Sequence, residues 1–248
     1  MSTANLNPAV EKTLLLLRHL GQSEGGLMQA ELARALGIAP STCYRILQTL
    51  RKHDWVCKGA DGRYDLSGGV FCATLKLHRR LVRWEHCRPL LDELATATGL
   101  TAKLSLRQGD RQVTILRAES PQPLSVSGKV GAWFPLIEGS VGAALLSRTP
   151  EEEIRELVRS CPEEIPERAN PGLVLARIQA IGVQGFCLNT NQARRRLGAL
   201  SAPLIGADGE VVAALTLLGV DEDFAGKQAG VLARRLLRAA RRYEKEHP

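Results

Sequence analysis

Two short amphipathic helices joined by a tight turn constrain the fold of this chain more than any other feature. The spacing of apolar residues predicts a helix over residues 28–36 that stops at Gly37, and a second helix that begins three residues later at Pro40. Glycine ends helices because it adopts the left-handed conformation without strain, and proline is favoured in a first helical turn. This arrangement predicts a helix-turn-helix.

A further amphipathic helix is predicted before this pair, over residues 8–21. Met28 stands at the N-cap position of the next helix, and its side chain has no oxygen to accept a hydrogen bond from the first-turn amides. We therefore expect that helix start to be weaker by about 1 kcal/mol than one capped by Ser, Thr, Asp or Asn.

The helix that begins at Pro40 has two faces of different chemistry. At about 100° per residue, one apolar stripe is formed by Cys43, Ile46, Leu47 and Leu50. The opposite face carries a hydroxyl, an amide and two cations, which are groups that bind phosphates and base edges of DNA. An ordinary solvated helix face is the alternative. The residues of this helix expected to contact DNA are Ser41, Thr42, Tyr44, Arg45, Gln48 and Lys52.

A β-hairpin is predicted directly after this helix, over residues 55–66, with its turn at Asp61–Gly62. A hairpin in this place is a wing, so residues 8–68 are predicted to form a winged helix-turn-helix. Lys58 and Arg63 stand near the tip of the wing and are expected to contact phosphates.

The positive charge of the chain is concentrated near its start. Residues 1–88 carry 13 Lys or Arg against 7 Asp or Glu, whereas residues 89–248 carry 20 against 19. Such an excess raises affinity for a polyanion, although a solvated basic face has the same composition. Aromatic residues make up only 4% of the chain, which argues against a binder of single-stranded nucleic acid that depends on stacking.

Residues 70–88 predict a linker helix with an apolar seam suited to a dimer contact, and residues 90–98 continue helically. Beyond Gly99, strands and helices alternate with hairpin-like turns, which favours an α+β domain on an antiparallel sheet. The predicted strands are 101–106, 112–118, 124–130, 183–188, 200–205 and 211–218. The predicted helices are 140–147, 150–159, 173–181 and 224–245.

Several classes of protein are not expected. The six cysteines form no CxxC pair and no histidine stands at zinc spacing, so we expect reduced thiols in a cytoplasmic protein, without a metal or cofactor. The sequence has no signal-peptide pattern and no apolar run that approaches ~18 residues, so neither export nor a membrane-spanning helix is expected. The sequence contains no nucleophile elbow, P-loop or dinucleotide-binding motif, and its histidines are sparse, so catalysis is not expected.

The chain resembles the IclR family of bacterial transcription regulators over nearly its whole length. The segments that carry the resemblance are AVEKTLLLLRHL, AELARALGIAPSTCYRILQTL, GRYDLSGG, VGAWFPLIEGSVGAALLS, IGVQGF and LSAPLIGADGEVVAALTLLG. The resemblance implies a winged helix-turn-helix over 8–68, a linker over 69–88 and a GAF-like effector-binding domain over 89–248. It also implies homodimers or dimers of dimers on palindromic double-stranded DNA, and a small carboxylate or aromatic effector.

The resemblance also implies an effector pocket. The loop at Ser140–Val141 presents backbone amides to a carboxylate, and further lining comes from positions that match Gln192, Ala199, Thr216 and Leu218.

The sequence departs from the family pattern at this pocket. Gly142–Ala143 replaces a Gly-Lys pair, Gln192 replaces a frequent Glu, and Arg196 replaces a frequent Gly. Leu218 stands where some members place a serine. We therefore expect a pocket that is more apolar or serves a different class of ligand.

Three other interpretations stay open. In the first, the chain is a DNA-binding regulator whose effector domain has degenerated and senses nothing. In the second, it is an enzyme on a GAF-like scaffold. In the third, it is a winged helix that docks on protein and not on DNA.

Overall fold

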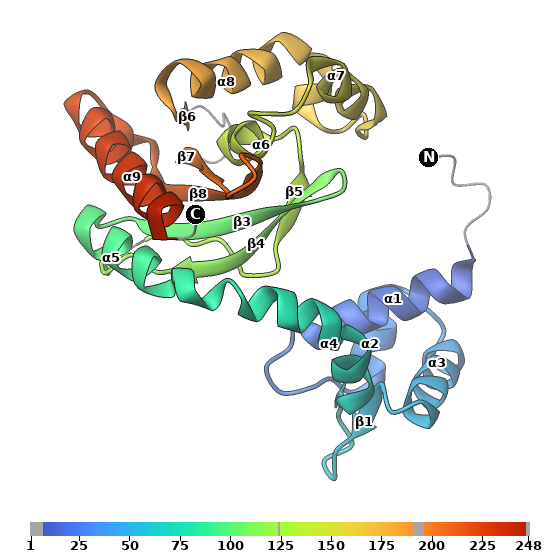
Figure 1. The fold of residues 1–248 in the computed structure, drawn as a ribbon. Helices are drawn as coiled ribbons and strands as arrows, with labels where there is room; N and C mark the ends of the chain where they lie inside the picture. The colour runs from blue at the N-terminus through green and yellow to red at the C-terminus, as the bar shows by residue number, and fades with distance from the viewer. Residues whose placement is uncertain (1–6, 124, 191–195, 247–248) are drawn as a thin grey trace. The chain divides into compact units, whose positions relative to one another are not determined.

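The computed structural model describes residues 7–123, 125–190 and 196–246. The chain divides into two compact units, residues 1–82 and residues 83–248 (Figure 1). Each unit has its own hydrophobic core.

The first unit is a winged helix-turn-helix, as predicted. Its elements in chain order are α1 (Pro8–Gly21), α2 (Gln29–Leu36), α3 (Pro40–Lys52), β1 (Val56–Lys58), β2 (Tyr64–Leu66) and α4 (Gly68–Val82). The turn between α2 and α3 begins with Gly37 at φ 62°, the left-handed conformation expected of a helix-ending glycine. The two strands pair antiparallel, with Cys57 opposite Asp65.

The core of this unit confirms the predicted apolar stripe of α3. Cys43 and Leu47 are fully buried, and Leu50 is nearly so. They pack in one cluster with Leu16 of α1 and Tyr64 of the hairpin. Burial of this one face leaves the opposite face of α3 in solvent.

Met28 provides no side-chain cap to α2, as predicted. Glu31 supplies one hydrogen bond at this helix start, because its Oε2 accepts from the Met28 backbone N–H at 2.7 Å. The same oxygen lies 3.4 Å from Nη1 of Arg63 in the hairpin. The wing is therefore joined to the start of α2 by an ion pair.

The predicted linker helix is wrong at its C-terminal end. It was expected to reach residue 88, but α4 ends at Val82 and a turn and the 3₁₀ helix η2 (Glu85–Cys87) follow. Cys87 is 1% exposed in the core of the second unit, and the Trp84 ring stacks on Tyr243 with centroids 6.1 Å apart. The apolar residues that extended the helical pattern thus serve the core of the other unit.

The second unit is a curled antiparallel sheet with helices on both faces, which confirms the predicted α+β architecture. The strand order is β5-β4-β3-β8-β7-β6. The strands are β3 (Thr101–Gln108), β4 (Arg111–Ala118), β5 (Trp133–Pro135), β6 (Cys187–Asn189), β7 (Leu197–Ile205) and β8 (Val211–Val220). The helices are α5 (Arg88–Thr98), α6 (Gly139–Leu145), α7 (Glu151–Ser160), α8 (Pro171–Gln184) and α9 (Lys227–Glu246), with 3₁₀ turns η3 (Pro166–Ala169) and η4 (Asp221–Phe224).

The two faces of this sheet differ in chemistry. Helices α5 and α9 cover one face, and α6 lies on the other with α8 behind it (Figure 1). The face under α5 and α9 is apolar, with Leu104, Leu200 and Leu215 fully buried. The opposite face carries buried polar side chains at Thr101, Lys103, Ser105, Ser201 and Thr216. A polar face that is nevertheless buried is where a ligand site is expected.

Two strand predictions in this unit were wrong. Within residues 125–130, predicted as part of a strand, the structure shows none, because side chains bind this backbone in place of a ladder. Thr101 Oγ1 donates to the Val126 carbonyl at 2.6 Å, and Arg117 Nη1 donates to the Gly128 carbonyl at 2.9 Å. The strand predicted over 183–188 is β6, which starts only at Cys187 because α8 continues to Gln184.

Candidate DNA-binding face and ligand cavity

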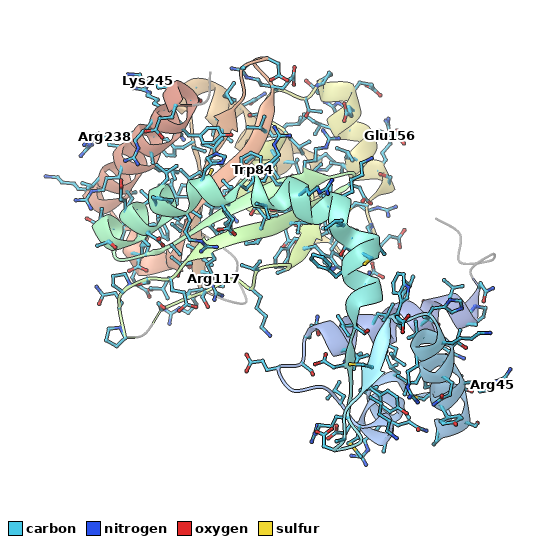
Figure 2. The ribbon with its side chains drawn as sticks, turned by 60° about the horizontal axis from the view of Figure 1, so that its bottom comes forward. Arg45, Trp84, Arg117, Glu156, Arg238 and Lys245 are labelled. Atoms are coloured by element: carbon cyan, nitrogen blue, oxygen red, sulfur yellow. The ribbon has the colours of Figure 1, made fainter. Side chains whose placement is uncertain are left out.

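The residues predicted to contact DNA share the solvent face of α3. Ser41, Tyr44, Arg45 and Lys52 are exposed, and Thr42 and Gln48 are partly buried. Arg45 projects from the outer surface of the first unit (Figure 2). Within the described residues, neither Arg45 nor Lys52 forms an ion pair, so both cations are available to phosphate or base edges.

The two cations of the wing are placed differently. Lys58 is exposed, with its Nζ 5.4 Å from the centroid of the Tyr64 ring. Arg63 is turned back toward the unit, where Nη1 donates to the Gly26 carbonyl at 3.2 Å and pairs with Glu31. Lys58 is therefore free to reach a phosphate, whereas Arg63 holds the wing in place and its phosphate contact stays a prediction.

A cavity of about 340 Å³ opens on the polar face of the sheet in the second unit. It is bounded by β3, β4, the start of α6, β6, β7, the end of β8 and the segment between β4 and β5. Its side chains include Lys103, Gln112, Thr114, Phe134, Glu138, Ser140, Val141, Asn189, Ala199 and Leu218. The volume is near the lower end of ordinary ligand pockets, about 300–1,000 Å³.

Four of the six residues predicted for the effector line this cavity, namely Ser140, Val141, Ala199 and Leu218. Thr216 lies one step away, in a chain of buried hydroxyls. Ser140 Oγ is 2.9 Å from Ser201 Oγ, which is 2.9 Å from Thr216 Oγ1. Gln192, the sixth, falls outside the described residues.

The start of α6 is fixed tightly against the sheet. Gly139 has φ 67°. A Cβ on Gly142 would lie 1.9 Å from the Leu136 carbonyl oxygen, so only glycine fits at position 142. Gln112 Nε2 donates to the carbonyls of Pro135 and Glu138 at 2.9 and 2.8 Å. These contacts hold Glu138 and Ser140 at the wall of the cavity.

Lys103 is a cavity residue that sequence reasoning missed. The side chain is only 9% exposed, although lysine is rarely buried. Burial lowers the pKa of the Lys103 ammonium, and the negative charge of Glu138 partly opposes that shift. The cavity therefore contains a lysine although Ala143 stands where the family has one, because Lys103 supplies a cation from β3 while Ala143 packs in an apolar cluster.

Asn189 is a second cavity residue that was missed. Its Oδ1 accepts a hydrogen bond from Arg177 Nη2 at 3.0 Å, and Arg177 Nη1 pairs with Glu167 Oε1 at 2.9 Å. These bonds define which end of the amide is the donor. Asn189 Nδ2 is buried and has no hydrogen-bond partner in the described part of the chain. Such a donor is costly unless a ligand or water accepts from it.

A sequence signal for Lys103 existed. Over residues 101–106, Lys103 alternates with Thr101 and Ser105, and the residues between them are apolar. Asn189 lies one residue beyond the strand predicted over 183–188. Polar residues with period two in a buried strand indicate a face that borders a site.

Comparison with known proteins gives the family. The model described as "IclR helix-turn-helix domain" matches residues 9–58, and the model described as "Bacterial transcriptional regulator IclR C-terminal" matches residues 76–244. This chain belongs to the IclR family of bacterial transcriptional regulators. Members of the IclR family bind DNA through the helix-turn-helix domain and are not enzymes.

Individual relatives agree. The HTH-type transcriptional regulator Rv1719 of Mycobacterium tuberculosis is 32% identical over 204 residues, 80% of this chain and 77% of that protein. A structure of an IclR homologue of Microbacterium hydrocarbonoxydans, complexed with 4-hydroxybenzoate, superposes with a TM-score of 0.75 at 16% identity, covering 96% of this chain and 98% of that one. The structure of an IclR transcriptional regulator of Alicyclobacillus acidocaldarius superposes with a TM-score of 0.72 at 22% identity, covering 97% of this chain and 99% of that one.

The described residues contain no group of three or more His, Cys, Asp or Glu side chains arranged to hold a metal ion. No helix among them is long and apolar enough to cross a membrane.

Proposed function

We propose that this protein is a cytoplasmic, sequence-specific DNA-binding regulator controlled by a small carboxylate or aromatic effector in the cavity of the second unit. The observation that carries the DNA-binding part is the exposed polar face of α3. Its apolar face is fixed in the core by Cys43 and Leu47, which leaves Ser41 and Arg45 in solvent. In this reading, residues 8–68 bind DNA, 89–248 bind the effector, and 69–88 join the two.

Helix α3 would enter the major groove. Side chains on its solvent face would read base edges or anchor phosphates, and cations at the end of α3 and on the wing would contact the backbone. The base-reading set is Ser41, Thr42, Tyr44, Arg45 and Gln48, and the backbone set is Lys52, Lys58 and Arg63.

A homodimer, or a dimer of dimers, would place two copies of α3 about one helical turn of DNA apart on a palindromic operator. An apolar side chain on α4 supports a dimer contact, because Leu77 is 47% exposed and a second copy would cover it.

The effector would bind in the cavity near Ser140 and Val141, with Ala199 and Leu218 against it. Thr216 would act through the hydroxyl chain to Ser140, and Gln192 completes the proposed set. The complex of a family member with 4-hydroxybenzoate supports a small organic acid or aromatic compound. A ligand that prefers one dimer geometry shifts the population between DNA-competent and DNA-incompetent forms.

Fluorescence anisotropy with a labelled duplex, identified by footprinting on genomic fragments, tests the DNA-binding part. Arg45→Ala should weaken specific binding by about 1–3 kcal/mol and relax sequence preference. Arg155→Ala is the matched control, because Arg155 is an exposed arginine of the second unit on α7. Unchanged affinity and sequence preference in Arg45→Ala would show that α3 is not the recognition helix.

Thermal unfolding with a panel of carboxylates and aromatic compounds tests the effector part. A ligand at ~100 Kd stabilises the folded protein by ~2.7 kcal/mol. If operator binding is intact and no compound shifts the melting temperature, the protein is a DNA binder with a degenerate, non-sensing domain.

A further inference from the structure

Helix α9 carries a stripe of positive charge on the side that faces away from the core. Its apolar residues Leu232, Leu236 and Ala240 are buried in the core of the second unit. At about 100° per residue, a sector of about 60° on the opposite side holds four exposed cations. We call these four the basic stripe: Arg234, Arg238, Arg241 and Lys245. Arg238 and Lys245 project outward from the helix (Figure 2).

The cations of the basic stripe have no counter-ion within the described part of the chain. Arg242, on the same helix but outside the stripe, shows the contrast. Its Nη1 lies 2.6 Å from Glu93 Oε2, and its Nε lies 3.1 Å from Glu246 Oε1. None of the four stripe side chains forms an ion pair or a side-chain hydrogen bond with another described residue. Like charges three or four residues apart on a helix repel, and a polyanion that covers the stripe would remove this repulsion.

The basic stripe also lines a hollow in the surface. This hollow has a volume of about 530 Å³ and is bounded by the four stripe cations together with Arg242 and Leu237. Among the described residues, no carboxylate borders it. Guanidinium groups bind phosphate oxygens through pairs of N–H donors. The chemistry of the hollow therefore suits phosphate groups.

Several kinds of polyanion carry enough negative charge to bind such a stripe, and the structure distinguishes among them. An anionic membrane is disfavoured, because a helix that binds a membrane surface inserts its apolar face, and that face of α9 is buried in the core. The acidic helix α7 of a second copy is disfavoured, because its glutamates are already paired with Arg107, Arg155 and Arg159. Single-stranded nucleic acid binds by stacking on aromatic rings, and among the described residues none borders the hollow.

Duplex DNA fits the basic stripe in charge and in length. The interval from Arg234 to Lys245 corresponds to about 17 Å along the helix. A duplex carries about ten phosphate charges over that distance. The first unit also brings DNA to this protein, because members of the IclR family bind DNA through the helix-turn-helix domain. One chain joins the two units, so DNA held by the first is at a raised local concentration near the second.

We propose that the basic stripe of α9 is a second, sequence-independent contact with duplex DNA, in which its arginine and lysine side chains bind backbone phosphates. The inference goes beyond the proposed function, which assigns DNA binding to residues 8–68 alone. Helix α3 supplies sequence preference. The basic stripe adds affinity that is equal for all sequences and falls steeply with salt.

Fluorescence anisotropy of the full-length protein with a duplex of unrelated sequence, at several salt concentrations, tests the inference. The test variant is Arg234→Gln/Arg238→Gln/Arg241→Gln, which leaves the buried face of α9 intact. Its affinity should fall about tenfold or more at about 0.1 M salt. The slope of log K against log[salt] should become shallower by roughly 1–3, because each phosphate contact contributes about 0.9 to that slope.

The matched control is Arg148→Gln/Arg155→Gln/Arg159→Gln, which removes three exposed arginines of the second unit outside α9. It changes the net charge by the same amount and should leave the slope unchanged. Equal loss of affinity in the test and control variants would overturn the inference, because total charge and not the basic stripe would then be responsible. If thermal unfolding shows that the test variant does not fold, Arg238→Gln alone should reduce the slope by about 0.9, and an unchanged slope overturns the inference.

Other occupants of the basic stripe give different results. If the test variant binds the duplex as wild type does but has a lower mass in analytical ultracentrifugation, the stripe is an interface between copies and the inference fails. If duplex binding is unchanged while binding to vesicles that contain phosphatidylserine is lost, the stripe binds a membrane and the inference fails as well.

Failure of the inference is distinguishable from failure of the proposed function. The test variant should weaken binding to the operator and to an unrelated duplex by the same factor, whereas Arg45→Ala should weaken operator binding more. If Arg45→Ala changes neither, the role of α3 is wrong and the basic stripe is unaffected. If the test variant changes neither while Arg45→Ala reduces operator binding, only the inference fails.

Discussion

The buried pair Arg177–Glu167 gives the sharpest test of the energetics behind the cavity. The Arg177 side chain is 12% exposed and that of Glu167 is 10% exposed, with Nη1 and Oε1 2.9 Å apart. Glu167→Gln keeps the volume and removes the negative charge, which leaves the Arg177 charge buried without a counter-ion. Removing one partner of a buried ion pair costs about 3–5 kcal/mol.

The same chain offers a matched exposed pair. Arg155 and Glu151 both lie on α7, and Arg155 Nη2 is 2.5 Å from Glu151 Oε1. Their side chains are 46% and 60% exposed. Solvent and salt screen such a pair, so Glu151→Gln should cost about 0–1 kcal/mol. The two variants carry the same chemical change and differ in burial.

Thermal unfolding monitored by circular dichroism measures the stability of both variants, with the transition of the second unit followed separately if the units unfold independently. For a domain of this size, about 2–4 °C in melting temperature corresponds to each kcal/mol. Glu167→Gln should therefore lower the melting temperature by roughly 6–20 °C, and Glu151→Gln by less than about 4 °C. Equal small effects would refute the reasoning, because they would mean that burial does not set the cost of losing the carboxylate.

The remaining predictions concern packing, thiols and assembly. Gly142→Ala should lower the free energy of unfolding by about 1–3 kcal/mol or more in denaturant titrations, because its Cβ would overlap a backbone carbonyl. A colorimetric thiol reagent at pH 8 should label Cys57 and Cys72, which are exposed, but not Cys187, whose pKa burial raises to about 11. Leu77→Asp should shift the oligomer toward monomer in analytical ultracentrifugation if α4 forms the dimer contact, and an unchanged mass would exclude that contact.

The first unit was predictable because its signals are local. Gly37, Pro40 and the 3.6-residue period of α3 each act within one or two turns of chain. The bounds predicted for α1 and α2 and the predicted start of α3 agree with the structure to within a residue. The compensation at Met28 was not predictable in full, because part of it comes from Arg63, which is 35 residues away in sequence. The end of α4 was predicted wrongly for the same reason, because the contact of Trp84 with Tyr243 joins residues that are far apart in sequence.

The residues that line the cavity were predicted only at the positions that the family resemblance supplied. Ser140, Val141, Ala199 and Leu218 line it, and the resemblance supplied those positions. Lys103 was missed because one of the two strands that pair with β3, namely β8, lies more than 100 residues later in the sequence. Which residues share a face across a sheet depends on strand order and register, and one sequence does not specify either.

Net charge by region is a weaker argument for DNA binding than the arrangement on α3. The near-neutral total of residues 89–248 conceals helix α9, which carries seven Lys or Arg against two Asp or Glu. Arg238 and Lys245 project outward from that helix (Figure 2). A strongly basic helix therefore occurs in the second unit as well, and positive charge raises affinity for any polyanion without reading sequence. The first unit differs because its cations share a helix face with Ser41 and Gln48, groups that discriminate base edges. The position of polar and basic side chains on the folded surface, and not an excess of positive charge, therefore distinguishes a DNA-recognition helix from a nonspecific basic patch.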